Sequence, residues 1–470
     1  MVGVTAYSFY VPRHRLERSL IAAAWGKRQT AGAIAVPNYD EDALTMAVEA
    51  ASGCLDEDRF PDALYFASTS GPYVEKQIAS AVATACDLPR QTQTADFGGS
   101  ARAGVSALVA ATHAVRSGGR RDVVVAASDC RLAEPDSELE GLLGGAAAAV
   151  RIGSDAVIAE IVDAAFVSEE FTHLWRTDEQ RFVQGYVGKF SNTYGYVRDV
   201  AEAARDLLER HGIPPGELAK VAAFAPDARA GADLCKALGV DAAKVLVAPI
   251  VAAIGSAGCA DALLALGAAL DVVEPGDWIL VAGYGEGADV VLLKATSALP
   301  SRRALSPWTN WVAAGLPLPS YERYLRHRRL VPVDATGEAI NNVLAHKELK
   351  QDVRLYGSRC EACGEVQYPE ARVCIRCGAR DRTVEHKLGK RGSIFTFTID
   401  HLIANVELPL PMAVVDLEGG GRVYVQVTDF EEAEVEIGSP VVLTYRRLHE
   451  GGGNHNYYWK ARPVRTEQAG

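Results

Sequence analysis

Along the first 296 residues, apolar strand-like runs alternate with helix-like segments that are rich in alanine. The stretch 104–128, GVSALVAATHAVRSGGRRDVVVAAS, reads as a small-residue helix, a glycine turn and a buried strand, and CADALLALGAALDVVEPGDWILVAGYG at 259–285 has the same pattern. Strands expected at 64–69 and 220–226 occupy matching earlier places. This internal repeat predicts a duplicated α/β domain, in which each half has a mostly parallel sheet covered by helices.

The duplication also predicts where a ligand binds. In open α/β folds, ligands lie beyond the carboxyl ends of the strands. We therefore expect functional residues on the loops that follow residues 69, 128, 224 and 284, and at the start of the helix near residue 101.

After residue 296 the pattern changes. Residues 297–320 carry four prolines, which is typical of a linker, and the segment SYERYLRHRR that follows predicts a short helix. Five short strands, from SIFTFTID to NYYWKARPV, then suit a small OB-type β-barrel. We expect Phe395, Phe397 and Tyr424 to pack in its core rather than stack on bases, and the acidic stretch FEEAEVE also argues against nucleic acid.

Four of the nine cysteines form two pairs, Cys360 with Cys363 and Cys374 with Cys377. Two such knuckles bring four thiolates within about 2.3 Å of one tetrahedral ion, which is the geometry of a structural zinc site. Glycines 364 and 378 follow the pairs and allow each knuckle to turn back on its ligand. Two disulfides or four buried thiols are the alternatives, but nothing else in the sequence indicates an oxidising compartment, and ribbon cysteines in an intracellular chain are typical metal ligands.

These changes divide the chain into five parts. The predicted boundaries are two halves of the α/β domain at 1–165 and 166–296, a linker and helical segment at 297–350, a zinc ribbon at 351–385 and a barrel at 386–470.

Charge and hydropathy exclude several classes of partner. The net charge of −12 argues against nucleic acid or an anionic membrane, because both attract a basic surface. The N-terminus has no signal pattern, and no apolar run approaches the roughly 20 residues that span a bilayer. We therefore expect a soluble, cytoplasmic protein whose remaining cysteines are reduced core residues.

Several segments carry a family resemblance. VPNYDEDALTMAVEAA (36–51), TSGPY (69–73), ASDCRLAEPDSELEGLLGGAAAAVRIG (127–153) and the stretch from Trp175 to Asn192 are similar to hydroxymethylglutaryl-CoA synthases, especially the archaeal type. That family belongs to the thiolase superfamily, so the resemblance implies a duplicated thiolase-like fold, an acyl-CoA substrate and a homodimer. The ribbon and barrel resemble the small zinc-ribbon OB proteins that accompany thiolase-like enzymes.

The resemblance also assigns catalytic positions, and this chain departs from the family at each of them. The ungapped match of TADFGGSARAGVSAL (94–108) puts Ala101 where the family has its acylated cysteine, and Thr69 stands where it has a glutamate. Phe224 and Ser256 replace a histidine and an asparagine. An alanine cannot attack a thioester and a phenylalanine cannot move a proton, so condensation through an acyl-enzyme is not expected.

Three interpretations follow from these replacements. The first is an enzyme that needs no acyl-enzyme, such as a (retro-)aldolase of a β-hydroxyacyl-CoA; zinc-ribbon OB proteins also accompany thiolase-like aldolases that lack the cysteine. Backbone N–H groups at the helix near Ala101 and at the loops 255–258 and 283–287 would then stabilise an enolate. The second is a non-catalytic scaffold that channels acyl groups to an active partner enzyme. The third is an acyltransferase that uses Cys259, although the following helix favours a packing thiol there.

Glu286 is the candidate base for the aldolase chemistry. It lies in GYGEGAD on a glycine-flanked loop, where a carboxylate can take a proton, although a solvent-facing glutamate fits the same pattern. Tyr284 precedes it and is either a proton donor or a core residue. Tyr186, Tyr194 and Tyr196 lie in the segment that the resemblance places near the substrate, where tyrosines also serve as packing residues.

The remaining candidates have weaker signals. Ser256 is either an oxyanion donor or a helix cap. His173 and Asp227 are expected to make structural hydrogen bonds, and Asp129 to cap a turn. Three basic residues are candidates to hold the CoA phosphates, with a solvated surface as the alternative for each: Lys189, Arg198 and Arg102.

Overall fold

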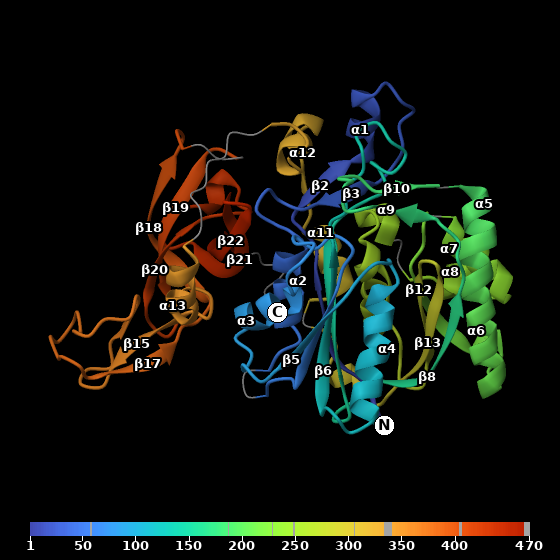
Figure 1. The fold of residues 1–470 in the computed structure, drawn as a ribbon, viewed down its shortest axis with the longest axis horizontal. Helices are drawn as coiled ribbons and strands as arrows, with labels where there is room; N and C mark the ends of the chain where they lie inside the picture. Colours follow the sequence, from blue (N-terminus) through green and yellow to red (C-terminus); the bar gives the residue numbers. More distant parts are fainter. Residues whose placement is uncertain are drawn as a thin grey trace.

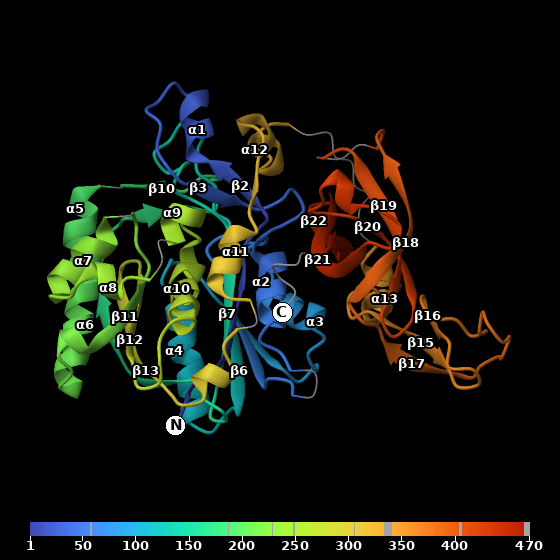
Figure 2. The same cartoon turned by 180° about the vertical axis from the view of Figure 1, so that it is seen from behind.

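A computed structural model of the chain consists of a large α/β domain and a smaller β-rich part to one side of it (Figures 1 and 2). None of the helices in the described part is long and apolar enough to cross a lipid bilayer. The structure describes residues 1–470 with the exception of 57–58, 187, 228, 248–249, 305, 333–340, 404–406 and 465–470.

The α/β domain is built on one nine-stranded sheet in the order β11-β12-β13-β8-β1-β7-β6-β4-β5. Most of its strands are buried runs of alanine, valine, leucine and isoleucine, as expected for strands covered on both faces. The strands are β1 Gly3–Tyr10, β4 Ala63–Ala67, β5 Gln93–Phe97, β6 Asp122–Asp129, β7 Ala146–Gly153, β8 Ala159–Ser168, β11 Leu218–Ala223, β12 Trp278–Tyr284 and β13 Gly287–Ala295.

The sheet consists of two matching halves, which confirms the predicted duplication. The run β4-β6-β7-β1 corresponds to β11-β12-β13-β8, and the two halves meet where Gly3 and Val4 of β1 pair with Glu160 and Ala159 of β8. Helices α4 (Ala103–Arg116) and α10 (Asp261–Leu270) precede β6 and β12 respectively. The chain therefore repeats one helix, strand and return-strand unit.

The expectation of mostly parallel sheets is wrong. Among the described pairings of the nine-stranded sheet, only β11–β12, β4–β5 and β4–β6 are parallel, and the other five are antiparallel. The reason is local: the two residues between β12 and β13 are too few for a crossover, so β13 returns directly alongside β12.

Small residues bring α4 and α10 close together on one face of the sheet, where they share a buried core (Figure 2). A Cβ at Gly104 would lie 2.1 Å from the carbonyl oxygen of Cys259, so only glycine fits at this contact. Helix α9 (Ile250–Ile254) packs into the same core. The other helices of the domain contribute to two further cores: α2 Ala43–Ser52, α3 Ile78–Ala85, α6 Arg198–His211, α7 Ala230–Leu238 and α8 Ala242–Val245.

The segment predicted as a linker contains ordered elements that pack on the α/β domain. Strand β14 (Leu316–Pro317) joins a three-stranded sheet with β2 (His14–Glu17) and β3 (Ala33–Val36). Three side chains of this segment are buried against Leu16 and Ile34, namely those of Leu318, Tyr321 and Tyr324. The helices of this region are α1 Arg18–Ala24, α11 Trp308–Ala313, α12 Tyr321–His327 and α13 Asn342–Asp352.

The β-rich part contains a small three-stranded sheet followed by a five-stranded one, ordered β20-β19-β18-β21-β22. A parallel bridge between Val427 and Ala461 links the two edges of the larger sheet and closes it, as expected for a barrel. The strands are β15 Tyr356–Cys360, β16 Val366–Gln367, β17 Thr383–Lys387, β18 Arg391–Asp400, β19 Leu410–Leu417, β20 Arg422–Gln426, β21 Pro440–Gly451 and β22 Asn454–Pro463.

Two of the three aromatic residues expected in the barrel core lie elsewhere. Phe397 packs against the core, but Phe395 and Tyr424 are exposed on the outer face. The Arg422 guanidinium covers the Phe395 ring at 3.7 Å from its centroid. A β-bulge near Phe395, where the β18–β19 register shifts between Ile394 and Thr396, turns this side chain outward.

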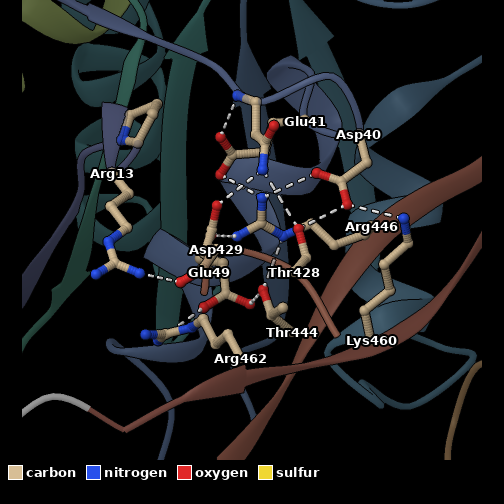
Figure 3. A network of polar contacts seen from close by, with 12 residues as sticks. Arg13, Asp40, Glu41, Glu49, Thr428, Asp429, Thr444, Arg446, Lys460 and Arg462 are labelled. Carbon is tan, nitrogen blue, oxygen red and sulfur yellow. Dashed lines mark hydrogen bonds and ion pairs between the residues drawn. The ribbon is translucent and has the colours of Figure 1, made fainter. Parts of the chain in front are cut away.

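A buried network of charges joins the barrel to the α/β domain (Figure 3). Arg446 of β21, which is 1% exposed, lies 2.6 Å from Asp429, 2.7 Å from Glu41 and 3.4 Å from Asp40. Lys460 of β22 lies 2.8 Å from Asp40. The acids at 40 and 41 immediately precede α2, so charges of one domain neutralise those of the other. This pairing stabilises one relative position of the two domains.

Candidate functional site

A cavity of about 140 Å³ opens where the two halves of the α/β domain meet. Thr69 and Arg131 contribute from the first half, and Phe224 and Glu286 from the second, while Ala101 lies just before α4. The four predicted loops and the predicted helix start therefore converge on one cavity. The other lining residues are Gly99, Ser100, His173, Leu174, Trp175, Arg176, Val183, Tyr284 and Gly285.

Glu286 occupies the two-residue turn between β12 and β13, with its side chain at the cavity wall. Its φ of 49° lies in the left-handed region, which is uncommon for a residue with a side chain. Backbone strain of this kind is retained where the surroundings fix it, and it is concentrated at functional sites. The half-buried carboxylate is thus held at the cavity by the hairpin.

Tyr284 and His173 form an aromatic pair in the same wall, with ring centroids 5.8 Å apart. Burial raises the pKa of the Tyr284 phenol and lowers the pKa of the His173 imidazole to about 4, so both are neutral at pH 7. Within the described residues, neither the Tyr284 hydroxyl nor His173 Nε2 has a hydrogen-bond partner. The expected structural hydrogen bond of His173 is therefore not present at Nε2.

Asp129 organises the loops around the cavity. Its fully buried carboxylate accepts hydrogen bonds from the hydroxyls of Ser68, Thr69 and Ser70 at 2.7 to 2.9 Å, and from the backbone N–H of Cys259 at 2.9 Å. Asp129 therefore holds the 68–70 loop of a neighbouring strand and the loop before α10, rather than the next turn that the sequence predicted.

Ser256 does not line the cavity. Its hydroxyl donates to Asp261 at 2.6 Å and accepts from Arg131 at 2.9 Å. Because this hydroxyl is already engaged, its predicted role as an oxyanion donor has no direct geometric support. Cys259 is also buried, and burial raises the pKa of its thiol well above the usual value, as expected for a packing residue.

The three tyrosines of the 186–196 segment lie in different environments. Tyr196 is fully buried against Tyr284 and Phe224. Tyr186 and Tyr194 are 69% and 54% exposed, and neither lines the cavity. Their catalytic roles stay predictions. The segment itself contains β10 Gln184–Gly185, α5 Lys189–Ser191 and a π-helical turn Asn192–Val197.

The predicted phosphate-binding residues lie outside the cavity lining. Lys189 is exposed, and Arg198 is paired with Asp199 at 2.7 Å and Glu169 at 3.5 Å. Arg102 donates to the carbonyl oxygen of Val167 at 3.0 Å and lies 3.4 Å from Asp289. Asp227 caps the turn before α7 by accepting from the N–H groups of residues 229 and 230.

Arg131 and Arg176 line the cavity but were not predicted from the sequence. Arg131 follows the strand end at residue 129, so its position after a predicted functional loop was an available signal. Arg176 comes from the loop after β9 (Leu174–Trp175), which has no periodic pattern. The Arg176 guanidinium donates to the Thr69 carbonyl oxygen at 3.1 Å.

The four paired cysteines lie together, as predicted. The sulfur atoms of Cys360 and Cys377 are 3.7 Å apart, those of Cys363 and Cys374 are 3.6 Å apart, and all four lie within 4.8 Å of one another. A tetrahedral ion with bonds of about 2.3 Å to sulfur requires separations of this size. The residues thus fit one metal ion, and Gly364 and Gly378 take the left-handed φ that each knuckle needs.

Comparison with known proteins agrees with this architecture. Residues 348–382 match the ChsH2 rubredoxin-like zinc ribbon domain, and residues 385–446 match the ChsH2 C-terminal OB-fold domain. A crystal structure of HMG-CoA synthase complexed with CoA superimposes with a TM-score of 0.65 at 17% identity and covers 72% of this chain and 92% of that one. A second, MvaS in complex with 3-hydroxy-3-methylglutaryl coenzyme A, has a TM-score of 0.62 at 22% identity, covering 72% and 94%. These likenesses establish the fold.

Sequence relatives establish the family. The hydroxymethylglutaryl-CoA synthase of Methanosarcina mazei is 29% identical over 343 residues, which are 70% of this chain and 98% of the relative. That of Methanopyrus kandleri is 30% identical over 298 residues, which are 61% of this chain and 85% of the relative. The chain therefore belongs to the hydroxymethylglutaryl-CoA synthase family, and it carries a zinc ribbon and an OB-fold domain of the ChsH2 type after its thiolase-like domain.

Proposed function

We propose that this protein makes or breaks a carbon–carbon bond of an acyl-CoA thioester without a covalent acyl intermediate, as a (retro-)aldolase of a β-hydroxyacyl-CoA. The observation that carries the proposal is the composition of the cavity. Ala101 lies at the helix start, and the described lining of the cavity contains no thiol, while Glu286, His173 and Tyr284 provide groups that transfer protons. Such a set suits proton chemistry and not acyl transfer.

In the cleavage direction, a base takes the proton of the β-hydroxyl group. The oxygen electrons form a carbonyl, the bond between Cα and Cβ breaks, and its electron pair becomes an acyl-CoA enolate. Protonation of the enolate at Cα then releases an acyl-CoA and a ketone or aldehyde. The reaction balances without an oxidant, a metal or an acyl-enzyme, so the absence of a cysteine at position 101 is no obstacle.

Glu286 is the proposed base, because it is the one carboxylate among the described lining residues of this cavity. Neutral His173 is the alternative base, since its Nε2 has no partner in the described part of the chain. Tyr284 and the backbone N–H groups near Ala101, before α4, would donate to the enolate oxygen. Loss of one donor of this type typically raises the barrier by about 3–4 kcal/mol.

The other proposed features concern assembly and the metal. The four-cysteine site would hold a structural zinc ion, which supports the ribbon and takes no part in the reaction. Strand β5 lies at an edge of the large sheet, where its unpaired backbone groups are open to another strand. We propose that a second copy pairs there to form a homodimer, and a partner enzyme of the same pathway is compatible with this arrangement.

The test is incubation of the purified protein with a panel of β-hydroxyacyl-CoAs and analysis of the products by mass spectrometry. Cleavage to a shorter acyl-CoA and a carbonyl compound, or the reverse condensation, supports the proposal. If no member of a broad panel reacts while CoA still binds, the aldolase proposal is wrong and the non-catalytic scaffold takes its place. Covalent labelling of Cys259 by an acyl-CoA would instead favour the acyltransferase.

A further inference from the structure

A second cavity, of about 300 Å³, lies where the barrel meets the α/β domain, and it shares Arg131 and Arg176 with the proposed active cavity. The barrel contributes Arg447 of β21 and His455 of β22 to its wall. We call this second cavity the arginine cleft. Its other basic lining residues are Arg181, Arg328 and Arg329, with His327 beside them.

The arginine cleft is strongly basic in a chain whose net charge is −12. Six guanidinium groups line it, and the described lining contains the carboxylates of Glu41 and Asp42 only. Both are engaged elsewhere: Glu41 lies 2.7 Å from Arg446, and Asp42 accepts from the backbone N–H of Thr45 at 3.0 Å and the Tyr457 hydroxyl at 2.7 Å.

One further carboxylate lies next to the cleft. Glu450 is 2.6 Å from Arg329 and 3.0 Å from Arg447, and it is also close to His455. The hydrogen bond from His455 and the two guanidiniums lower the pKa of Glu450 to about 2. Together with Asp42 and with Asp261, which acts on Arg131, Glu450 offsets part of the positive charge, and the six guanidiniums still outnumber these carboxylates.

Backbone carbonyl groups hold several of these arginines in place. The Arg447 guanidinium donates to Tyr39 O at 2.9 Å, that of Arg328 to Cys130 O at 2.6 Å, and that of Arg176 to Thr69 O at 3.1 Å. A carbonyl fixes a guanidinium without neutralising it, and each guanidinium keeps further donors. Within the described residues, the Nε groups of Arg131, Arg329 and Arg447 are buried and have no partner. Guanidiniums that are held in place and keep further donors are suited to phosphate oxygens.

We propose that the arginine cleft binds the phosphate groups of CoA, with Arg447 and His455 of the barrel among the residues that contact them. The thioester end would pass Arg131 and Arg176, which border both cavities, and reach Ala101. The barrel would therefore complete the CoA site, in place of the predicted Lys189 and Arg198. This inference rests on the proposed function in taking CoA as the ligand. A 3′-phosphate alone carries about −1.5 to −2 charges at pH 7, which is opposite in sign to the surplus in the cleft.

The first test uses the unmodified protein. Isothermal titration calorimetry compares CoA with dephospho-CoA, which lacks the 3′-phosphate, and with pantetheine, which has no phosphate. Each phosphate that is removed takes its charge-assisted hydrogen bonds with it. We therefore expect dephospho-CoA to bind roughly tenfold or more weakly than CoA, and pantetheine to bind more weakly again by a similar factor. The affinity for CoA should also fall as the salt concentration rises. Equal affinity for CoA and pantetheine would overturn the proposal.

The second test locates the site by substitution. Arg328→Gln combined with Arg447→Gln, at two arginines that line the cleft but not the proposed active cavity, is expected to weaken CoA binding by about tenfold to a hundredfold while leaving pantetheine binding unchanged. Arg372→Gln is the matched control, because Arg372 is an exposed arginine on the ribbon. If the combination Lys189→Gln and Arg198→Gln causes the loss instead, the CoA phosphates bind at the predicted residues and the arginine cleft is excluded.

These outcomes are separable from the failure of the proposed function. Binding is measured with CoA itself and needs no turnover. If the protein binds CoA through the cleft but cleaves no β-hydroxyacyl-CoA, the cleft proposal holds and the aldolase proposal is wrong. If the protein turns over substrate and the cleft substitutions do not change CoA binding, the aldolase proposal holds and the cleft proposal is wrong.

Discussion

The imidazole of His173 and the phenol of Tyr284 line the same cavity with their ring centroids 5.8 Å apart, although His173 lies in the loop after β8 and Tyr284 at the end of β12. Both are buried and neutral at pH 7, because burial lowers the pKa of His173 to about 4 and raises that of Tyr284. A neutral imidazole accepts a proton and a neutral phenol donates one. The pair thus offers both functions beside the carboxylate of Glu286.

Replacement of Glu286 by glutamine tests the proposed base. Because general base catalysis contributes about 10²–10⁴-fold, we expect kcat for retro-aldol cleavage to fall at least a hundredfold, with KM little changed. Glu274→Gln, at an exposed glutamate far from the cavity, serves as the control. A variant that keeps the full rate shows that Glu286 is not the base, and the same measurement on His173→Gln then tests the alternative.

The buried His173 also predicts a dependence of stability on pH. Its folded pKa of about 4 lies below the ordinary value of 6.5, so the unfolded chain binds the proton more readily between these values. The native state therefore loses stability as the pH falls from 6.5 towards 4, by about 2 kcal/mol from this residue between pH 7 and pH 5. Urea unfolding at both pH values should show this loss in the native chain and a correspondingly smaller one in His173→Gln. Equal losses in the two proteins would contradict it.

The charge network between the domains predicts a large effect for Arg446. Removal of one member of a buried, paired set leaves uncompensated charges, which typically costs about 3–5 kcal/mol. Arg446→Met is therefore expected to lower the free energy of unfolding by this amount, as measured by chemical denaturation. Arg422→Met removes an exposed arginine of the same barrel that pairs with Asp416, and it should leave the unfolding midpoint nearly unchanged. Similar effects of the two substitutions would show that the buried network does not stabilise the fold.

Metal removal should affect the ribbon and spare the cavity. We expect about one zinc ion per chain by elemental analysis, bound by the four cysteines. After treatment with a chelator, hydrogen exchange should accelerate in residues 356–387 and stay slow in α4 and α10, because those helices belong to a separate hydrophobic core. Cys374→Ser should reproduce the effect. A loss of protection throughout the chain would contradict a local role of the metal.

Cys259 should resist modification. The thiol is buried, and its pKa is raised well above the usual value, so little thiolate is available to react. We expect the intact mass of the native protein to stay unchanged after incubation with an acyl-CoA, and peptide mapping to find Cys259 free of iodoacetamide. An acylated Cys259 would show that this protein uses a different nucleophile.

The parts of the fold that depend on residues close together in the sequence were predicted correctly. The repeated helix and strand around Gly104 and Cys259, and the four paired cysteines, depend on neighbours in sequence, and the structure has both. The direction of the strands could not be inferred from burial alone, since parallel and antiparallel buried strands have the same apolar composition. The exposed Phe395 was also missed, because a bulge shifts the alternation by one residue.

The site was predictable as a location but not as a set of side chains. The loops were correct because strand ends determine them. The roles of Ser256, Tyr186 and Tyr194 were not accessible, since the direction in which a loop side chain points depends on distant partners such as Asp261. The arginine cleft gave no signal at all, because its basic residues come from separate segments and form no run in the sequence.

The buried network around Arg446 has a kinetic consequence. Its charges belong partly to the barrel and partly to the segment before α2. Separation of the two parts would therefore leave ionised groups without their partners. If the barrel were a separate protein, its rate of association with the α/β domain would depend on the concentrations of both. Here both parts share one chain and one fixed stoichiometry, so the barrel stays beside the α/β domain whatever the dilution.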